Sequence, residues 1–340
     1  MNLDNLEEVL INEPKFRLQQ IKKAVFGNLI ENWFEAAYLP LPLKDKLKKK
    51  CSLEIKGEID GSGNNGDVLK AVIVLDDGVK IESVLMRHEN GLADSGRRNT
   101  VCVSSQAGCA MGCGFCATGA AGFKRNLTAW EIVGQVLFFA RYLKNESERV
   151  SNVVFMGMGE PFLNYENVLS AIRILNDKDG LNIGARKISV STCGIIEGIE
   201  KLAGENIQVN LAVSLHAPDE ELRLKLMPVN KKYPLKKVLS AVDGYIKKTS
   251  RQVTFEYLLL RGINDSEDRA EKLAKLMRKP LYFVNLIIYN PTGAKDMEPS
   301  FSRDVKRFKE ILEKFGVPVS QRYRFGGDIK AACGQLALKK

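Results

Sequence analysis

Three cysteines lie close together in the segment Cys109-Ala-Met-Gly-Cys113-Gly-Phe-Cys116, directly after a strand-like stretch at residues 100–106. Three thiolates at this spacing can surround one metal centre, and they leave a fourth coordination position open for chemistry. Zinc motifs more often combine paired cysteines with nearby histidines, whereas the two histidines, His88 and His216, are distant in sequence. The pattern therefore favours a reactive iron–sulfur cluster, with a zinc site or a structural disulfide as the alternatives.

An aromatic residue, Phe115, precedes the last of these cysteines, and the motif resembles the signature of the radical S-adenosylmethionine (SAM) superfamily. Five further segments narrow the resemblance to the RlmN/Cfr family of RNA adenosine methyltransferases. In chain order they are Cys102-Val-Ser-Ser-Gln-Ala-Gly-Cys109, Phe155-Met-Gly-Met-Gly-Glu-Pro161, Ser214-Leu-His-Ala-Pro218, Tyr289-Asn-Pro291 and Ala332-Cys-Gly-Gln-Leu336. Chance does not produce such an ordered set.

The resemblance implies which residues bind cofactors. In this family three cysteine thiolates hold a 4Fe-4S cluster, and the amino and carboxylate groups of SAM chelate its free iron. The implied cluster ligands are Cys109, Cys113 and Cys116. The implied SAM contacts follow successive predicted strands, although each alone would more often be a capping or turn residue. They are Gly159, Glu160, Ser191, Ser214, Leu215, His216 and Asn290.

Two cysteines outside the cluster motif receive catalytic roles from the same resemblance. C2 and C8 of adenine are electrophilic carbons, so methylation there requires a radical route. In the family mechanism Cys333 accepts a methyl group from one SAM, and a second SAM supplies the radical that activates this group for addition to adenine. Cys102 then attacks Cys333 to release the product, and Glu82 is the expected base. Without the resemblance, Glu82 would be interpreted as a surface residue and Cys102 as a small apolar one.

Other residues near these motifs have simpler interpretations. Cys51 and Cys193 lack a motif context and are interpreted as structural. Arg322, Arg324 and Phe325 are candidate phosphate and base-stacking contacts for RNA, although a C-terminal edge strand explains them equally well.

After residue 100 the chain alternates predicted strands with predicted helices. The strands are expected at 100–106, 151–157, 186–191, 207–214, 251–259 and 281–289, and the helices at 128–144, 165–175, 234–248, 266–278 and 302–315. Six such βα units predict an α/β fold with a parallel sheet and right-handed crossovers, here an open (β/α)6 partial barrel of the TIM-like, radical SAM type. The motifs lie at or just after the carboxyl ends of these strands, where α/β barrels bind ligands.

Two smaller units are expected before this core, which takes residues 96–340 with its C-terminal catalytic-cysteine loop. Residues 1–52 have helical spacing of apolar side chains and predict a small helical accessory domain. Its lysines between residues 44 and 50 fit either RNA phosphate contact or a solvated helix face. Residues 53–95 predict a β-hairpin extension, with strands at 53–59, 68–75 and 79–86, followed by a basic loop at 87–99.

Composition restricts the partners and the compartment. The 340 residues include 51 lysines and arginines against 41 acidic residues, and the net charge of +10 favours a polyanion as partner. The sequence shows no signal-peptide pattern and no long apolar run, so we expect a cytoplasmic protein without a membrane segment. Seven unevenly spaced cysteines fit a reducing compartment. We expect a monomer because no apolar stripe is left unassigned.

Within the family, two activities are possible. RlmN-type members methylate C2 of an adenosine in the peptidyl transferase centre of 23S rRNA and of the adenosine beside the anticodon of some tRNAs, whereas Cfr-type members methylate C8 of the rRNA base and confer antibiotic resistance. Pro161 and Asn164 resemble the C2 type, and Phe325-Gly-Gly resembles the C8 type. We predict C2 methylation of 23S rRNA and tRNA, with C8 as the alternative.

The remaining expectations concern partners and rival classes of protein. The resemblance implies a flavodoxin- or ferredoxin-type electron donor. One rival is a non-catalytic RNA-binding protein with a structural metal site, which would need neither Cys102 nor Cys333. Another is a radical SAM enzyme that acts on a peptide or metabolite, which would lack the Ala332-Cys-Gly-Gln-Leu336 segment.

Overall fold

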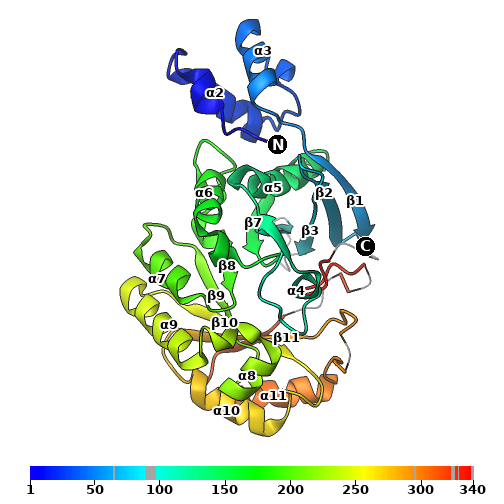
Figure 1. The fold of residues 1–340 in the computed structure, drawn as a ribbon, viewed down its shortest axis with the longest axis vertical. Coiled ribbons are helices and arrows are strands. Elements are labelled where there is room, and N and C mark those ends of the chain that lie inside the picture. Colours follow the sequence, from blue (N-terminus) through cyan, green and yellow to red (C-terminus); the bar gives the residue numbers. More distant parts are fainter. Residues whose placement is uncertain (64–65, 89–96, 295, 323–325, 328, 338–340) are drawn as a thin grey trace.

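The computed structural model describes residues 1–63, 66–88, 97–294, 296–322, 326–327 and 329–337. Within these residues the central element is a ten-stranded sheet in the order β1-β2-β3-β4-β7-β8-β9-β10-β11-β12 (Figure 1). Parallel pairing runs from β4 to β12, which confirms the α/β class and the series of βα units. The parallel strands are β4 (Arg98–Cys102), β7 (Val150–Phe155), β8 (Ile188–Thr192), β9 (Asn210–Ser214), β10 (Val253–Leu259), β11 (Tyr282–Ile288) and the unpredicted β12 (Val319–Gln321).

The strand predicted at residues 100–106 is instead two elements. β4 ends at Cys102, and the chain then leaves the large sheet to pair β5 (Gln106–Gly108) with β6 (Phe123–Asn126). Ser104 gives the reason, because its backbone N–H donates to the side chain of Gln135 at 2.7 Å. Its hydroxyl donates to the carbonyl of Glu82 at 2.7 Å. Side chains thus replace the ladder partners that a continuous strand would need.

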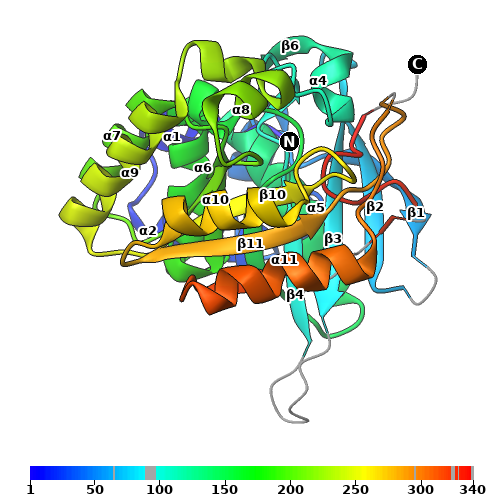
Figure 2. The ribbon, with the colours of Figure 1, turned by 90° about the horizontal axis from the view of Figure 1, so that it is seen from below.

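Long helices cover the outer face of the parallel strands (Figure 2). The start of α5, the first of these long helices, was predictable from its capping residues. Thr128 accepts from the N–H of Glu131 at 3.2 Å, and Glu131 accepts from the N–H of Thr128 at 2.9 Å. This capping box satisfies two donors that a helix start otherwise leaves free. The helices are α5 (Ala129–Lys144), α6 (Tyr165–Asn176), α7 (Ile196–Gly204), α9 (Leu235–Thr249), α10 (Glu267–Met277) and α11 (Ser302–Lys314), with the shorter α4 (Ala117–Ala121) and α8 (Glu220–Leu226) in connections.

Three antiparallel strands extend the sheet beyond β4. They are β1 (Lys56–Ser62), β2 (Val68–Val74) and β3 (Lys80–His88). The strand predicted at 53–59 therefore begins three residues later, because Leu53 is buried against the core before the sheet edge is reached. β3 pairs Val84 with Cys102, so this extension forms a wall beside the end of β4. Most of the basic loop predicted at 87–99 lies outside the described residues.

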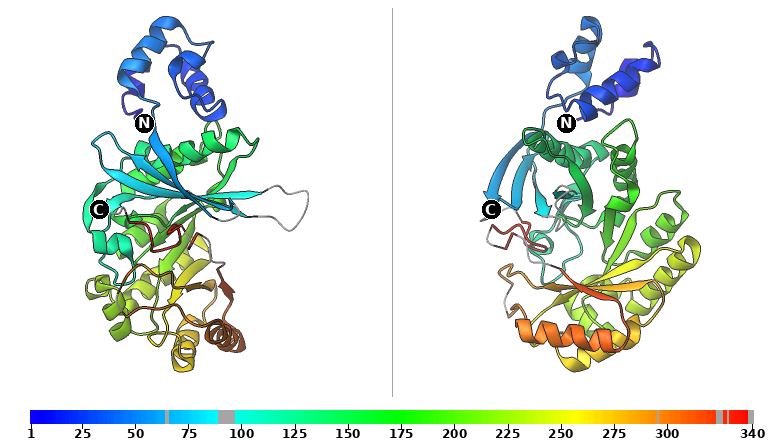
Figure 3. Two further views of the ribbon diagram at one scale, coloured as in Figure 1. Left: turned by 90° about the vertical axis from the view of Figure 1, so that its right-hand side faces the viewer. Right: turned by 180° about the vertical axis from the view of Figure 1, so that it is seen from behind.

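The N-terminal helices form a separate layer at one end of the sheet (Figure 3). They are α1 (Leu6–Leu10), α2 (Phe16–Lys22) and α3 (Leu41–Lys50), with a short π-helical turn at Lys23–Gly27 and a 3-10 turn at Trp33–Glu35. Arg141 of α5 holds this layer by donating to the carbonyls of Ile30 and Leu53 at 2.5 and 3.1 Å. Cys51 is fully buried there, as its structural interpretation predicted. No helix among the described residues is long and apolar enough to cross a bilayer.

Candidate active site

The loop with the three clustered cysteines is shaped by its backbone. Gly108 has φ +78°, and a Cβ there would lie 1.9 Å from the carbonyl oxygen of Gly122. That carbonyl accepts from the N–H of Cys109 at 2.9 Å, which closes the loop between β5 and β6. The N–H of Ala117 donates to the carbonyl of Gly334 at 2.9 Å. The cysteine loop and the C-terminal segment are therefore joined directly.

All three clustered cysteines line one pocket at the carboxyl ends of the parallel strands. The pocket encloses about 870 Å³ of unfilled space, part of it open to solvent, which is within the usual range for a nucleoside-sized ligand. Most of the predicted SAM contacts line it as well, namely Gly159, Glu160, Ser191, Ser214 and His216, together with Cys333. The topology thus gathers residues from four strand ends, as the sequence pattern predicted.

The donor set in this pocket fits an iron–sulfur cluster. Thiolates are the ligands that such clusters prefer, and three of them come from one short loop. Among the described residues, no group of three histidine, cysteine or acidic side chains is gathered closely enough to hold a single metal ion. A 4Fe-4S cluster differs from a zinc ion in this respect, because its ligands bind separate iron atoms.

Glu160 is held rigidly at the pocket wall. Its carboxylate accepts from the N–H groups of Cys193 at 2.6 Å and Phe162 at 3.0 Å. Burial raises the pKa of Glu160, and these hydrogen bonds oppose the rise. Gly159 leads into it with φ +101°, in close contact with Gln106. The carboxylate is thus oriented for a cationic partner, such as the amino group expected of SAM.

His216 is a buried, neutral side chain of the pocket. Burial lowers its pKa to about 3, and its Nδ1 accepts from the N–H of Leu258 at 3.1 Å. Its ring meets that of Phe115 edge-on at 4.8 Å, so it supports the cysteine loop. Leu215, also a predicted contact, has a fully buried side chain and is not among the residues that line the pocket. Asn290 lines a neighbouring cavity instead.

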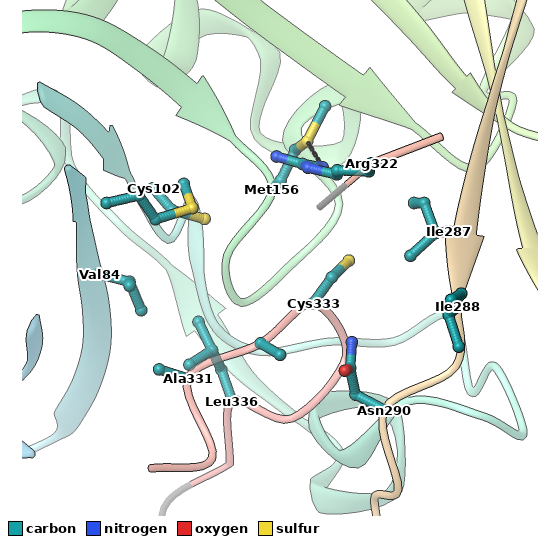
Figure 4. A pocket seen from close by; sticks show the side chains of 12 residues that line it. Val84, Cys102, Met156, Ile287, Ile288, Asn290, Arg322, Ala331, Cys333 and Leu336 are labelled. Carbon is teal, nitrogen blue, oxygen red and sulfur yellow. Dashed lines mark hydrogen bonds between the residues drawn. The ribbon is translucent and has the colours of Figure 1, made fainter. Parts of the chain in front are cut away.

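That neighbouring cavity contains both predicted catalytic cysteines (Figure 4). Cys102 comes from the end of β4 and Cys333 from the C-terminal segment, and Cys333 also lines the cluster pocket. Burial raises the pKa of Cys102 to about 12. Cys333 is exposed as a residue, and the protein around its sulfur raises the pKa of this thiol less than that of Cys102. The nearby positive charge of Arg322 acts in the opposite direction on both. Cys333 therefore connects the two cavities.

Glu82 is buried, contrary to the surface position that its strand pattern alone indicated. Its Oε1 lies 3.2 Å from Nζ of Lys70, which also lies 2.8 Å from Oδ2 of Asp60. Asp60 reaches this lysine because β1 has an irregular register between Ile59 and Gly61. Glu82 does not line either cavity, although Val84, two residues along the same face of β3, lines the cavity of the two cysteines. Burial raises the pKa of Glu82 despite the ion pair.

Three pocket residues were missed or misinterpreted from the sequence. Cys193, interpreted as structural, lines the cluster pocket, and its position directly after Ser191 and Thr192 was the available signal. Glu256 of β10 also lines it, buried and bound by Asn285 at 2.8 Å. Arg322 directly follows the edge strand β12, and its backbone N–H donates to the carbonyl of Leu286 at 2.9 Å, so the C-terminal edge strand is present. Its side chain lines both cavities and donates to the sulfur of Met156 at 3.4 Å. Arg324 and Phe325 lie outside the described residues.

The fold and this thiol-lined pocket define the class of protein. Residues 103–277 match the model of the Radical SAM superfamily, and the chain belongs to it. Members of this superfamily use a 4Fe-4S cluster and SAM as cofactors.

Comparison with known proteins narrows the family. The chain is 44% identical to the probable dual-specificity RNA methyltransferase RlmN of Dictyoglomus thermophilum, over 98% of this chain and 94% of that one. It is also 44% identical to the protein of the same name from Geobacillus thermodenitrificans, over 100% and 92% of the two chains. A radical SAM methyltransferase from Sphaerobacter thermophilus has the same fold, with a TM-score of 0.92, 43% identity and coverage of 99% and 97%. The chain is a member of the RlmN family.

Proposed function

We propose that this protein methylates C2 of an adenosine in 23S rRNA and of the adenosine beside the anticodon in tRNA, through a methyl group carried on Cys333. The observation that supports this most directly is the shared cavity of Cys102 and Cys333, which adjoins the pocket of the cluster cysteines. The related RlmN proteins are named dual-specificity RNA methyltransferases, which supports two RNA substrates.

Each cysteine has a distinct task in this proposal. When bound, the cluster supplies the electron that cleaves SAM and starts radical chemistry; we assign its ligation to Cys109, Cys113 and Cys116. Cys333 borders both cavities, so its sulfur can carry a methyl group between the SAM pocket and the RNA base. Cys102 faces it and can attack the Cys333 sulfur, forming a disulfide and freeing the methylated RNA. An external reductant, such as a flavodoxin or ferredoxin, then restores both thiols.

SAM binding in this proposal uses the fixed polar groups of the pocket. Glu160 accepts from the ammonium group, while Ser191, Ser214, Leu215 and His216 line or support the remaining surface. Asn290 borders the cavity of Cys333, on the side where the methyl group has to pass.

Glu82 remains the proposed base for the C2 proton. Its Oε2 is buried without a well-formed hydrogen bond among the described residues, and the backbone of Ala337 in the C-terminal segment approaches the carboxylate, so a proton can be accepted here once that segment moves. Lys70 and Asp60 connect the other oxygen to the protein surface, since the side chain of Asp60 is half exposed. Because Glu82 does not line the cavity itself, the proposal requires the C-terminal segment beside it to move when RNA binds.

The net charge of +10 and the lysines of α3 support RNA as the partner. Lys48, Lys49 and Lys50 end that helix in exposed positions, whereas Lys44 is buried. We therefore assign phosphate contact to the C-terminal half of α3, within the accessory domain proposed for residues 1–52.

Turnover of the reconstituted protein with SAM and a 23S rRNA fragment tests the function. The modified nucleoside is identified by mass spectrometry against C2- and C8-methyladenosine standards, and an anticodon stem-loop is tested in parallel. C2-methyladenosine in both RNAs is the expected result. C8-methyladenosine would instead establish the resistance-type activity, and cleavage of SAM without RNA modification would contradict an RNA substrate of this kind.

A further inference from the structure

Arg223 of α8 is the largest side chain that the described fold buries completely. Its Nη1 donates to Oδ1 of Asn230 at 2.6 Å and to the carbonyl of Tyr233 at 3.2 Å. Its Nη2 donates to the carbonyl of Cys193 at 2.6 Å. All three acceptors are neutral, and its Nε has no partner among the described residues. Arg223 forms no ion pair with an acidic side chain among the described residues. The guanidinium is thus fully buried with only neutral hydrogen-bond acceptors.

Such a cation is costly to bury. An arginine stays protonated in proteins, and removing its charge from water costs several kcal/mol unless an opposite charge compensates for it. Glu220 does not meet Arg223 directly: its carboxylate binds Asn230 and the N–H groups of Leu235 and Lys236. Glu220 therefore compensates for the charge of Arg223 only indirectly, through Asn230, and Cys193 and Cys113 act on the same guanidinium from the side of the cluster loop.

The surroundings of Arg223 point toward the cluster loop. The N–H of Gly114, between two cluster cysteines, donates to the carbonyl of Leu226 at the end of α8 at 3.0 Å. Cys193, whose carbonyl binds Arg223, has its thiol in hydrogen-bond contact with Cys113. A single residue therefore separates the guanidinium from a cluster ligand. Arg223 does not line the cluster pocket, so it lies behind the pocket wall.

A neighbouring glycine makes this arrangement possible. Gly194 has φ +100°, and a Cβ at this position would lie 3.3 Å from Nη2 of Arg223 and 2.9 Å from Val238. A side chain at this position would be strained by the backbone φ, would clash with Val238 and would press against the guanidinium. Gly194 thus leaves room for Arg223 and Val238 behind the turn after β8.

We propose that Arg223 is the buried counter-charge of the 4Fe-4S cluster. An oxidised cluster with a 2+ core and three thiolates carries a net negative charge, and one-electron reduction makes it more negative. A fixed cation behind Cys113 compensates for this charge and stabilises the reduced form more than the oxidised one. Arg223 is therefore a positioning residue that raises the reduction potential. The inference depends on the cluster of the superfamily and is independent of the RNA substrate.

Redox titration of the reconstituted full-length protein tests the proposal. The cluster is monitored by the electron paramagnetic resonance signal of its reduced form. Arg223→Gln keeps hydrogen-bond donors but removes the charge, so its midpoint potential should be more negative than that of the wild type. Arg223→Lys should restore most of the difference. Arg141→Gln is a matched control, since Arg141 also donates to two backbone carbonyls and has a buried Nε without a partner, but lies at the N-terminal layer.

Thermal unfolding of the cluster-free and the cluster-loaded chains gives a second readout. Arg223→Gln should reduce the stabilisation that the cluster provides while leaving the cluster-free chain as stable as the wild type, or more stable. An unchanged potential in Arg223→Gln would overturn the proposal. So would a cluster-free Arg223→Gln chain that fails to fold where the wild type folds, because the charge would then be needed without the cluster. If Arg223→Gln shows the expected more negative midpoint potential but the wild-type protein does not methylate RNA, only the proposed function is contradicted.

Discussion

Cys102 and Cys333 line one cavity although they come from the first parallel strand and from the C-terminal segment. Val84 of β3, the pairing partner of Cys102, lines the same cavity, so the antiparallel extension closes its side. Arg322 lines the same cavity, with its guanidinium beside Met156 (Figure 4). Two distant parts of the chain, β3 with β4 and the C-terminal segment, thus surround the sulfur atoms that the proposed chemistry uses.

Replacing either catalytic cysteine should block methylation, but at a different step. Cys102→Ala should leave RNA covalently bound to the protein, because no thiol remains to release it from Cys333. Cys333→Ala should give neither methyl-cysteine nor methylated RNA. Denaturing gels and peptide mass spectrometry distinguish the two outcomes, and Cys51→Ala serves as the control. Complete turnover by Cys102→Ala would contradict its role in release.

Removal of the charge of Arg322 should make Cys333 less reactive. This charge lowers the thiol pKa of both cysteines, and at Cys102 it opposes a burial that raises the pKa to about 12. Arg322→Gln should therefore raise both pKa values further, so that less thiolate is present at a given pH. We expect alkylation of Cys333 by iodoacetamide to slow by roughly three- to tenfold and its pH profile to move to higher pH. Peptide mapping follows Cys333 alone, and an unchanged profile would show that the charge does not act on this thiol.

Lys70→Met should destabilise the fold in a pH-dependent manner. Without the lysine, Glu82 is a buried carboxyl group whose pKa rises further, and ionising it at neutral pH costs about 3 kcal/mol. The unfolded chain ionises Glu82 at lower pH than the folded one, so the loss should grow with rising pH and shrink as Glu82 becomes protonated. Urea unfolding at pH 7.5 and 5.5 measures the difference.

Two further variants control this comparison. Lys80→Met removes an exposed lysine of β3 and should change the free energy of unfolding little. Glu82→Gln combined with Lys70→Met should recover most of the stability, since the only charge then left unpaired is that of Asp60, whose side chain is half exposed. A loss that is the same at both pH values would mean that Lys70 acts by packing alone.

Gly159→Ala should disrupt the wall of the cluster pocket. A Cβ at Gly159 would lie 2.5 Å from Cβ of Gln106, and its φ of +101° is strained for any side chain. We expect a loss of about 2 kcal/mol or more in the free energy of unfolding. Gly184→Ala is the control, because that glycine has φ −54° and open space around its Cα. Equal losses in the two variants would contradict the steric argument.

The sequence alone determined the elements and the chemistry that local rules govern. Thr128 and Glu131 form the capping box that their spacing predicts, and the carboxyl ends of parallel strands bring Glu160 and Ser214 to one pocket. Both follow from periodicity and from the geometry of parallel sheets, which depend on nearby residues. The spacing of Cys109, Cys113 and Cys116 likewise predicted an iron–sulfur cluster without knowledge of the fold.

Only the tertiary structure decided what long-range burial does to single side chains. The alternation of polar and apolar residues around Glu82 does not predict that the C-terminal segment and Lys70 cover its carboxylate. Cys193 and Arg223 likewise have no motif in the sequence around them. In the fold, the thiol of Cys193 contacts Cys113, and Arg223 binds the carbonyl of Cys193 from behind. A charge or a thiol acquires its role from the groups around it in space, and these come from distant parts of the chain.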